Sequence, residues 1–267
     1  MPTTVNDIIT YIERLAGHPL NRDEGIQHGA DRPITGVTVC WMASPEAIRA
    51  AGTPVTGAPA TGLLIGHESL YYPYDVIHNP NPPAGWEGWQ VNRQRRDLLT
   101  EFDLTFLRAH GSLDEICIFE DFGARLGLNA PVFADGLVKV YEIAPCPLGE
   151  LVKRVKARMG MPALRVSPAR GMDQVVRRVG LPWGGLGLFV NVGYQQRLIE
   201  QGCDVFIAGE SDNYGFRFAA ECGIPMIETS HELSENDGLH RFTDMLAQAF
   251  PDVRCRFFEN ICVWEIH

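Results

Sequence analysis

The sequence predicts an α/β protein. Short apolar runs typical of buried strands alternate along the chain with segments of helical periodicity, and 45% of the 267 residues are apolar, which is enough for a substantial core. The length allows one large domain or two modest ones.

Helices are predicted where apolar residues recur every three to four positions. The first begins near Val5, with Thr4 or Asn6 as its cap, and ends at Gly17 and Pro19. The later helices are expected at Pro45–Ala51, Arg93–Glu101, Asp121–Leu126, Leu148–Met159, Tyr194–Gln201 and Phe216–Cys222, and in a last helical pattern that carries Leu239, Phe242, Leu246 and Phe250.

Strands are predicted where apolar or β-branched residues form short runs between turn residues. These runs are Thr35–Trp41, Gly62–Ile65, Leu104–Ala109, Val138–Ile143, Leu164–Ser167, Leu186–Val192, Asp204–Ala208, Ile224–Ile227, Val253–Phe258 and Ile261–Ile266.

A segment rich in proline and aromatic residues, Tyr71–Gln90, interrupts this alternation. Its prolines exclude regular structure, and its aromatic surface is large enough to hold it in order. A lid or a subunit contact is one interpretation, and a surface loop packed on its own side chains is the other.

Three histidines each stand beside a carboxylate, just after a predicted strand. The pairs are His67 with Glu68, His110 with Asp114, and His231 with Glu235. Ligands of open α/β sheets gather at the carboxyl ends of strands, and imidazole with carboxylate suits divalent metals. Because 33 residues are acidic, an acid stands at any fixed offset from a histidine by chance about one time in eight, so scattered surface or capping residues are the alternative.

Charge and cysteine content narrow the class of protein. The net charge of −10 argues against a nucleic-acid partner, and the odd number of cysteines, seven, without a C-x-x-C pair argues against a secreted disulfide framework. The amino end does not resemble a signal peptide, and no run of about 18 apolar residues occurs, so we expect no membrane partner and a cytoplasmic location.

Other catalytic signatures are weak. The glycines between Gly184 and Gly193 form no phosphate-binding loop, and we interpret that stretch as a flexible turn into a strand. No G-x-S-x-G elbow or evident Cys-His pair occurs. The remaining histidines have no recurring partner and are expected at the surface or in caps: His18, His28, His78, His240 and His267.

Four segments together resemble a known family. GLLIGHESL (62–70), RAHGSLDEI (108–116), DVFIAGE (204–210) and IPMIETSHELSENDG (224–238) are similar, in order and spacing, to the motifs of the Nif-three-like family of dinuclear metal-centre proteins. Those motifs are His-His-Pro, His-x-x-x-Asp, Thr-Gly-Glu and Gly-His-x-x-x-Glu, each after an apolar strand. The resemblance spans about 34–250.

The resemblance implies a set of metal ligands. His67, Asp114, His231 and Glu235 match the family pattern, and His110 belongs to its motif as a ligand or as a residue that orients one. Glu68 replaces the second histidine, Ser69 the proline and Ala208 the threonine. A carboxylate at position 68 shifts the preference from zinc toward iron, manganese or magnesium and leaves one or two metals open.

The resemblance also implies a fold, an assembly and an activity. It implies two similar interlinked lobes facing a metal cleft, one of about 1–130 with 224–267 and the other of about 131–223, in a homo-oligomeric, often hexameric, ring. We expect hydrolysis of a small cyclic C–N substrate by metal-activated water, with Glu210 or Glu232 moving the proton. The alternative is a non-catalytic metal-binding or regulatory protein.

Overall fold

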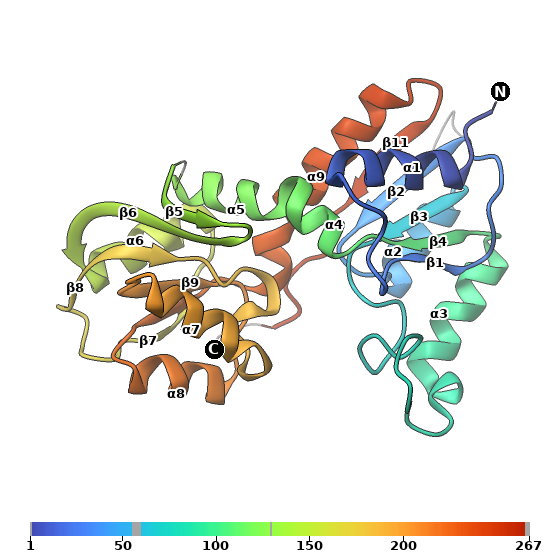
Figure 1. Cartoon of the computed structure of the whole chain (residues 1–267). Coiled ribbons are helices and arrows are strands. Elements are labelled where there is room, and N and C mark those ends of the chain that lie inside the picture. Colours follow the sequence, from blue (N-terminus) through green and yellow to red (C-terminus); the bar gives the residue numbers. More distant parts are fainter. Residues whose placement is uncertain (1, 55–59, 129, 265–267) are drawn as a thin grey trace. The chain divides into compact units, whose positions relative to one another are not determined.

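The structure, a computed structural model, describes residues 2–54, 60–128 and 130–264. The chain forms two compact units. The first consists of Met1–Cys117 and Gly238–Asn260, and the second of Ile118–Asp237 and Ile261–His267. Each unit has its own sheet (Figure 1).

The sheet of the first unit is mixed and has the strand order β1-β4-β3-β2-β11. Its strands are β1 (Gly25–His28), β2 (Gly36–Cys40), β3 (Leu63–Gly66), β4 (Thr105–Arg108) and β11 (Arg254–Phe258). Strands β4, β3, β2 and β11 run parallel, and β1 pairs antiparallel with β4 at the edge. The carboxyl ends of β3 and β4 are therefore neighbours.

Helices cover both faces of this sheet (Figure 1). They are α1 (Val5–Ala16), α2 (Pro45–Gly52), α3 (Gln90–Glu101), the short α4 (Gly111–Leu113), the 3-10 turn η1 (Trp86–Gly88), the π-helical turn η2 (Asp114–Ile118) and most of α9 (His231–Ala249). The Thr4 side chain caps α1 in a capping box with Asp7, as predicted. One core cluster joins α2 and α3 to the sheet through Ile48, Leu99 and Phe106.

The sheet of the second unit has the order β5-β6-β8-β9-β10-β7. Its strands are β5 (Pro131–Asp135), β6 (Val138–Pro147), β7 (Arg165–Ser167), β8 (Val175–Gly180), β9 (Val205–Ala208) and β10 (Met226–Glu228). Strands β8, β9 and β10 are parallel, whereas β5 with β6, β6 with β8 and β10 with β7 pair antiparallel. This mixed sheet again leaves two parallel strand ends, those of β9 and β10, side by side.

The second unit packs its helices on the strands of this sheet. They are α5 (Phe119–Leu126), α6 (Leu148–Met159), α7 (Val192–Glu200), α8 (Asn213–Glu221) and two 3-10 turns, η3 (Gly184–Gly187) and η4 (Phe189–Asn191). Leu198 of α7 and Ala219 of α8 share a core cluster with Phe206 of β9. Helix α9 begins in this unit and continues into the first.

Several sequence predictions of single elements were wrong. The expected strand Leu186–Val192 is a pair of 3-10 turns leading into α7, because Gly187 and Asn191 break the extended pattern. Within the predicted strand Ile261–Ile266, residues 261–264 are not a strand, and the rest lies outside the described residues. Strands β1, β5 and β8 were not predicted, since they lack a clear apolar run.

The compact units differ from the predicted lobes at residues 224–237. These residues lie in the second unit, because β10 pairs with β9 on one side and with β7 on the other. The first unit also ends earlier than the predicted 1–130, at Cys117.

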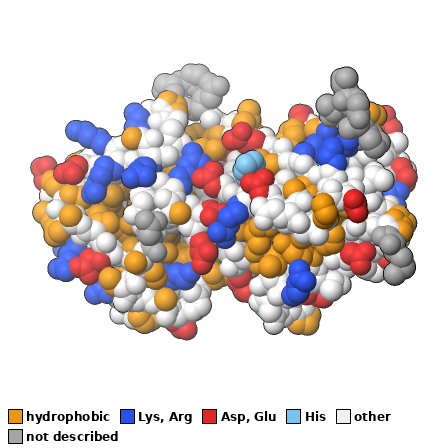
Figure 2. All heavy atoms as spheres, turned by 90° about the horizontal axis from the view of Figure 1, so that it is seen from above, with side chains coloured by type: hydrophobic (Ala, Val, Ile, Leu, Met, Phe, Trp, Pro, Cys, Tyr) orange, Lys and Arg blue, Asp and Glu red, His pale blue; other side chains and the backbone are white. Residues whose placement is uncertain are grey.

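On the face shown in Figure 2, Lys and Arg side chains are interspersed with Asp, Glu and apolar side chains. Among the described residues, no helix is both long enough and apolar enough to cross a membrane.

Candidate metal centre

Three potential ligands of the first unit meet at the ends of β3 and β4. His67 and Glu68 follow β3 directly, and His110 follows β4 after one residue. Because these strands are parallel neighbours, the three side chains converge, and one ligand atom from each lies within 4.8 Å of the others. His67 and Glu68 are 1% and 5% exposed. Three side chains that the sequence places after strands are therefore neighbours within this unit.

His67 is oriented by a backbone carbonyl. Its Nδ1 lies 3.2 Å from the carbonyl oxygen of Ala109, so we assign the ring proton to Nδ1. Its Nε2 lies 3.9 Å from Oδ1 of Asp114, which stands in the turn η2. A histidine held in this way presents the lone pair of Nε2 to a metal.

His110 is held by two acidic residues that the sequence analysis did not single out. Asp23 Oδ2 lies 2.9 Å from His110 Nδ1, and Glu24 Oε1 accepts a hydrogen bond of 2.6 Å from the His110 backbone N–H. Glu24 also accepts hydrogen bonds from the Ser112 backbone N–H and hydroxyl. The loop that carries His110 is thus fixed from a segment 86 residues earlier in the chain.

Neighbouring acidic residues affect the protonation of His110. Burial lowers the pKa of His110, but the hydrogen bond to Asp23 and the charges of Glu68 and Asp114 outweigh it and raise the pKa to about 9. The hydrogen bond from His110 is the largest cause that lowers the pKa of Asp23 to about 2. The raised pKa favours the protonated form of His110 at neutral pH, so a divalent cation bound by this residue would have to displace a ring proton.

The partners of His110 and Asp114 differ from the predicted pairing. The sequence pairs these two residues by their spacing of four, whereas the structure hydrogen-bonds His110 to Asp23 and brings Asp114 to His67. Both residues stay in the same group, because the charge of Asp114 still acts on His110.

A second donor set lies in the second unit. His231 begins α9 after β10, and Glu235 follows one helical turn later, so that Nε2 lies 3.3 Å from Glu235 Oε1. Glu210 follows β9 and places its Oε2 3.0 Å from His231 Nδ1. The Glu235 side chain is 3% exposed and that of Glu210 is 47% exposed. His231 is therefore held between one buried and one accessible carboxylate.

The glycine turn η3 packs against this second set. Gly184 has φ of 50°, and a Cβ built there would lie 2.0 Å from Glu235 Oε1 and 3.1 Å from His231 Nε2. Its N–H donates to Ser234 Oγ and its carbonyl accepts from the Glu210 N–H. The turn thus lies directly against the two candidate ligands.

Sequence comparison assigns the chain to a family. The sequence model of Duf34/NIF3 (NGG1p interacting factor 3) matches residues 81–262, more than half of the chain. The chain belongs to this family. The residues of both donor sets therefore belong to a NIF3-family protein with a candidate buried His/Glu/Asp metal-binding cluster.

Curated NIF3-like relatives match only part of the chain. Two proteins named GTP cyclohydrolase 1 type 2 homolog, from Neisseria meningitidis and Haemophilus influenzae, are 28% identical over 88 residues and 30% identical over 87 residues. The matches cover 33% and 32% of this chain, and the chain spans about a third of the length of each relative.

Solved structures share the NIF3-like fold over the whole chain. A Bacillus cereus protein related to NIF3 is 14% identical with a TM-score of 0.75, and the alignment covers 100% of this chain and 99% of that one. A hypothetical protein from Staphylococcus aureus is 16% identical with a TM-score of 0.74, and each chain is covered completely. At these identities the likeness concerns the fold.

The departures of this NIF3-family chain from the motifs fall inside buried surroundings. Glu68 reaches the same group of ligand atoms as His67 and His110. Ala208 is fully buried in the core of the second unit. Ser230 stands where the motif has glycine, and its φ is 95°, a conformation that glycine adopts without strain.

Glu232, the other residue predicted to transfer the proton, is buried. It is 6% exposed in the first turn of α9. It lies near the thiol of Cys262, whose pKa is raised mainly by burial. Its role in proton transfer stays a prediction.

The residues present fit a divalent cation. Imidazole nitrogen and carboxylate oxygen are its ordinary ligands, and His67, Glu68 and His110 offer both kinds within one small group. His67 and His231 belong to different units, so their convergence on one centre stays a prediction.

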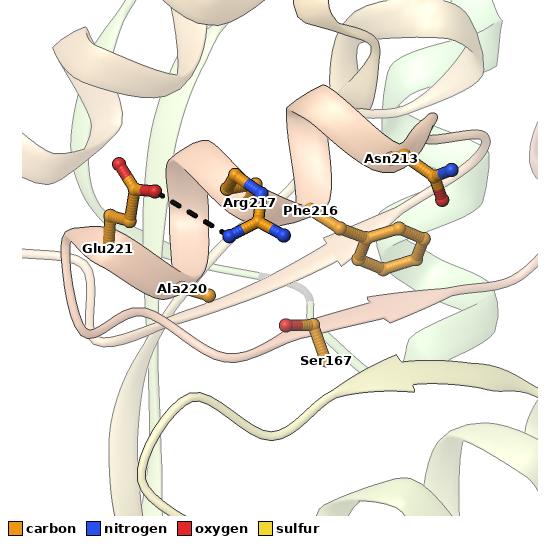
Figure 3. A pocket seen from close by; sticks show the side chains of 6 residues that line it. All are labelled: Ser167, Asn213, Phe216, Arg217, Ala220 and Glu221. Atoms are coloured by element: carbon orange, nitrogen blue, oxygen red, sulfur yellow. Dashed lines mark ion pairs between the residues drawn. The ribbon is translucent and has the colours of Figure 1, made fainter.

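An open pocket lies elsewhere in the second unit, over α8 and β7. It has a volume of about 370 Å³ and is lined by Ser167, Asn213, Phe216, Arg217, Ala220 and Glu221 (Figure 3). None of the predicted site residues, all of which the structure describes, lines this pocket.

Proposed function

We propose that this protein is a metal-dependent hydrolase that opens the C–N bond of a small cyclic amide, imide or nucleotide-like substrate. The observation that carries the proposal is the group formed at two parallel strand ends by the buried His67 and Glu68 with the partly buried His110. Buried carboxylate and imidazole groups cost folding free energy unless they are paired or bind a metal, so a group of this composition indicates a functional site.

Each unit offers proposed ligands. The first offers His67, Glu68, His110 and Asp114, and the second offers His231 and Glu235. The carboxylates favour iron, manganese or magnesium beside zinc, and we expect two ions. A bound divalent cation lowers the pKa of its water toward neutrality and polarises a substrate oxygen.

Acidic residues of this chain would transfer the proton in this reaction. In the proposed hydrolysis a water oxygen bonds to the amide or amidine carbon, the C–N bond breaks, and the departing nitrogen takes the water proton. Glu210 suits this transfer because its half-exposed carboxylate exchanges protons with solvent while it contacts His231 Nδ1. Glu232 is the second candidate, as a buried carboxyl group.

The names of the relatives support the substrate class. Both matched relatives are named as homologues of a GTP cyclohydrolase, an enzyme class that opens a C–N ring, although each match covers about a third of the sequence. We therefore place purine and pterin rings beside lactams and imides in the substrate panel.

Elemental analysis followed by assays with and without chelator tests the proposal. We expect bound metal in the purified protein, ring opening that a chelator abolishes and one added metal restores, and loss of both metal and turnover in His67→Ala. His240→Ala is the matched control, because its side chain is 63% exposed and pairs only loosely, at 4.0 Å, with Asp244.

The same experiment distinguishes the proposed hydrolase from the alternative function. Stoichiometric metal without turnover on any compound of the panel indicates a metal-binding or regulatory protein. Turnover that persists in the metal-free protein contradicts both.

A further inference from the structure

The segment between β3 and α3 is held firmly at its base. Asn92, which is fully buried, accepts a hydrogen bond from the Tyr72 backbone N–H and donates to the carbonyls of Tyr72 and Trp86. Arg95 donates to the carbonyl of Leu70. Neighbouring side chains, Tyr71 among them, belong to the core cluster of the first unit. The base of the segment is therefore packed into the folded unit.

Tyr74 is the aromatic side chain of this segment that reaches the first donor set. Its hydroxyl accepts a hydrogen bond of 2.7 Å from Nη2 of Arg108 and lies 3.3 Å from Nε2 of His110. The next residue, Asp75, contacts Arg108 through its carboxylate and donates its N–H to Ser69 Oγ. The phenol is thus fixed at its polar end, beside the nitrogen that His110 offers to a metal.

The ring of Tyr74 is nevertheless open. The residue is 57% exposed, while Arg108 behind it is fully buried. The guanidinium carbon lies 5.0 Å from the ring centre, so a positive charge polarises the ring. An exposed aromatic ring removes little apolar area from water and so contributes little to stability. Stability therefore does not explain why this ring is anchored by a buried cation.

We propose that Tyr74 determines substrate specificity by stacking on a planar, electron-rich ring bound at the first donor set. The proposal rests on the proposed function for the presence of a ring-shaped ligand at this place. An electron-rich ring such as guanine is favoured because the neighbouring guanidinium withdraws electron density from the phenol. A saturated ring with the same amide bond gains little from this contact.

Calorimetric titration of the metal-loaded protein with guanosine and with δ-valerolactam tests the proposal. We expect Tyr74→Leu to weaken guanosine binding by roughly tenfold, the range of one aromatic stacking contact, and to leave δ-valerolactam binding unchanged. Tyr74→Phe keeps the ring and should bind guanosine within about threefold of the original protein. Metal content should be the same in all variants.

Tyr72→Leu is the matched control. Tyr72 lies in the same segment, is 41% exposed and has the guanidinium of Arg95 4.9 Å from its ring centre, but its hydroxyl contacts Met42 instead of His110. It should bind guanosine like the original protein.

Three results would overturn the proposal: no guanosine binding to the original protein, equal binding by Tyr74→Leu, or equal losses in Tyr74→Leu and Tyr74→Phe. Loss of metal in Tyr74→Leu would also overturn it, since that indicates a role in holding the site. Binding is measured without turnover, so failure of the proposed hydrolysis would appear separately in the assays.

Discussion

At the scale of single residues, Ser230 holds a backbone conformation that is unfavourable for any residue with a Cβ. Its φ is 95°, it is 2% exposed, and it stands immediately before the candidate ligand His231. Its hydroxyl accepts a long hydrogen bond, 3.5 Å, from the Leu233 backbone N–H and also interacts with the thiol of Cys262. The position therefore combines backbone strain with a weak helix cap.

Replacing Ser230 by glycine should stabilise the protein. Relief of the strained φ is worth about 1 kcal/mol or more, whereas a Ser-to-Gly change at a cap costs only a few tenths. Ser230→Ala is the control: it keeps the strain, loses the cap and should lower the free energy of unfolding. Denaturant midpoints that rank alanine above glycine would contradict this explanation.

Glu24 is a second single residue that holds the backbone around His110 in place. Its two carboxylate oxygens accept from the backbone N–H groups of Asn21, His110 and Ser112 and from the Ser112 hydroxyl, and the residue is 8% exposed. This carboxylate accepts hydrogen bonds from four donors. An amide in its place would direct its own N–H group toward at least one of these donors, which would then lack an acceptor.

We expect Glu24→Gln to lower the free energy of unfolding by about 2 kcal/mol, because a buried donor loses its acceptor. The substitution should also displace the loop that carries His110. We expect this to weaken metal affinity by about tenfold or more, because residues that orient a metal ligand affect the affinity. Competition with a coloured chelator measures the affinity, and the exposed Glu101→Gln serves as control. Unchanged affinity in Glu24→Gln would mean that His110 is not a ligand.

At the scale of elements, the sequence pointed to the candidate site residues through the ends of predicted strands. Apolar runs before His67, His110 and His231 correctly placed β3, β4 and β10, because a buried parallel strand must be apolar on both faces. Since the carboxyl ends of neighbouring parallel strands share an edge, the grouping of His67 with His110 followed.

The elements that the sequence did not reveal act over long separations or through backbone shape. Asp23 and Glu24 lie 87 and 86 residues from His110, and no periodicity links acids at such a distance. Likewise, the helix of His231 and Glu235 was predicted only from Leu239 onward, because its first turns are polar on the side of the ligands. Gly184 is recognisable only once Glu235 is seen beside it.

The turn η3 gives the prediction at this scale. Gly184→Ala places a Cβ in the space of the Glu235 carboxylate and imposes an unfavourable φ, so the turn or the ligand must move. We expect a loss of bound metal, measured by elemental analysis, and a stability lower by about 1–3 kcal/mol. Gly193→Ala is the matched control, because a Cβ there meets nothing within 4 Å. Equal metal content in both variants would exclude a cradle role.

At the scale of the whole molecule, each unit repeats one arrangement. Each sheet has two neighbouring parallel strands that are followed by a histidine or a carboxylate, β3 and β4 in the first unit and β9 and β10 in the second. Within each unit the topology thus brings candidate donors to one edge of its sheet, whereas their orientation depends on contacts from Asp23 and Glu24 in the first unit and from η3 in the second.

Stability against pH depends on groups of the whole chain whose pKa differs between the folded and unfolded states. Burial, with a smaller effect of Arg96, lowers the pKa of His28 from 6.5, so the unfolded chain takes up its proton first as the pH falls. Hydrogen bonds to the Pro19 carbonyl and to Glu115 raise the pKa of His18 from 6.5, so His18 adds stability below 6.5 that is lost as the pH rises through its folded pKa.

The two histidines should therefore respond in opposite directions when each is replaced by glutamine. Between pH 8 and pH 5, His28→Gln should lose less stability than the original protein, because the cost of protonating a half-buried imidazole is gone. His18→Gln should be less stable than the original protein at pH 5 and equal to it at high pH. Thermal midpoints across this range, taken on metal-free protein so that ligand protonation is common to all three, measure both effects. Parallel shifts of the two variants at every pH would show that packing, and not protonation, is responsible.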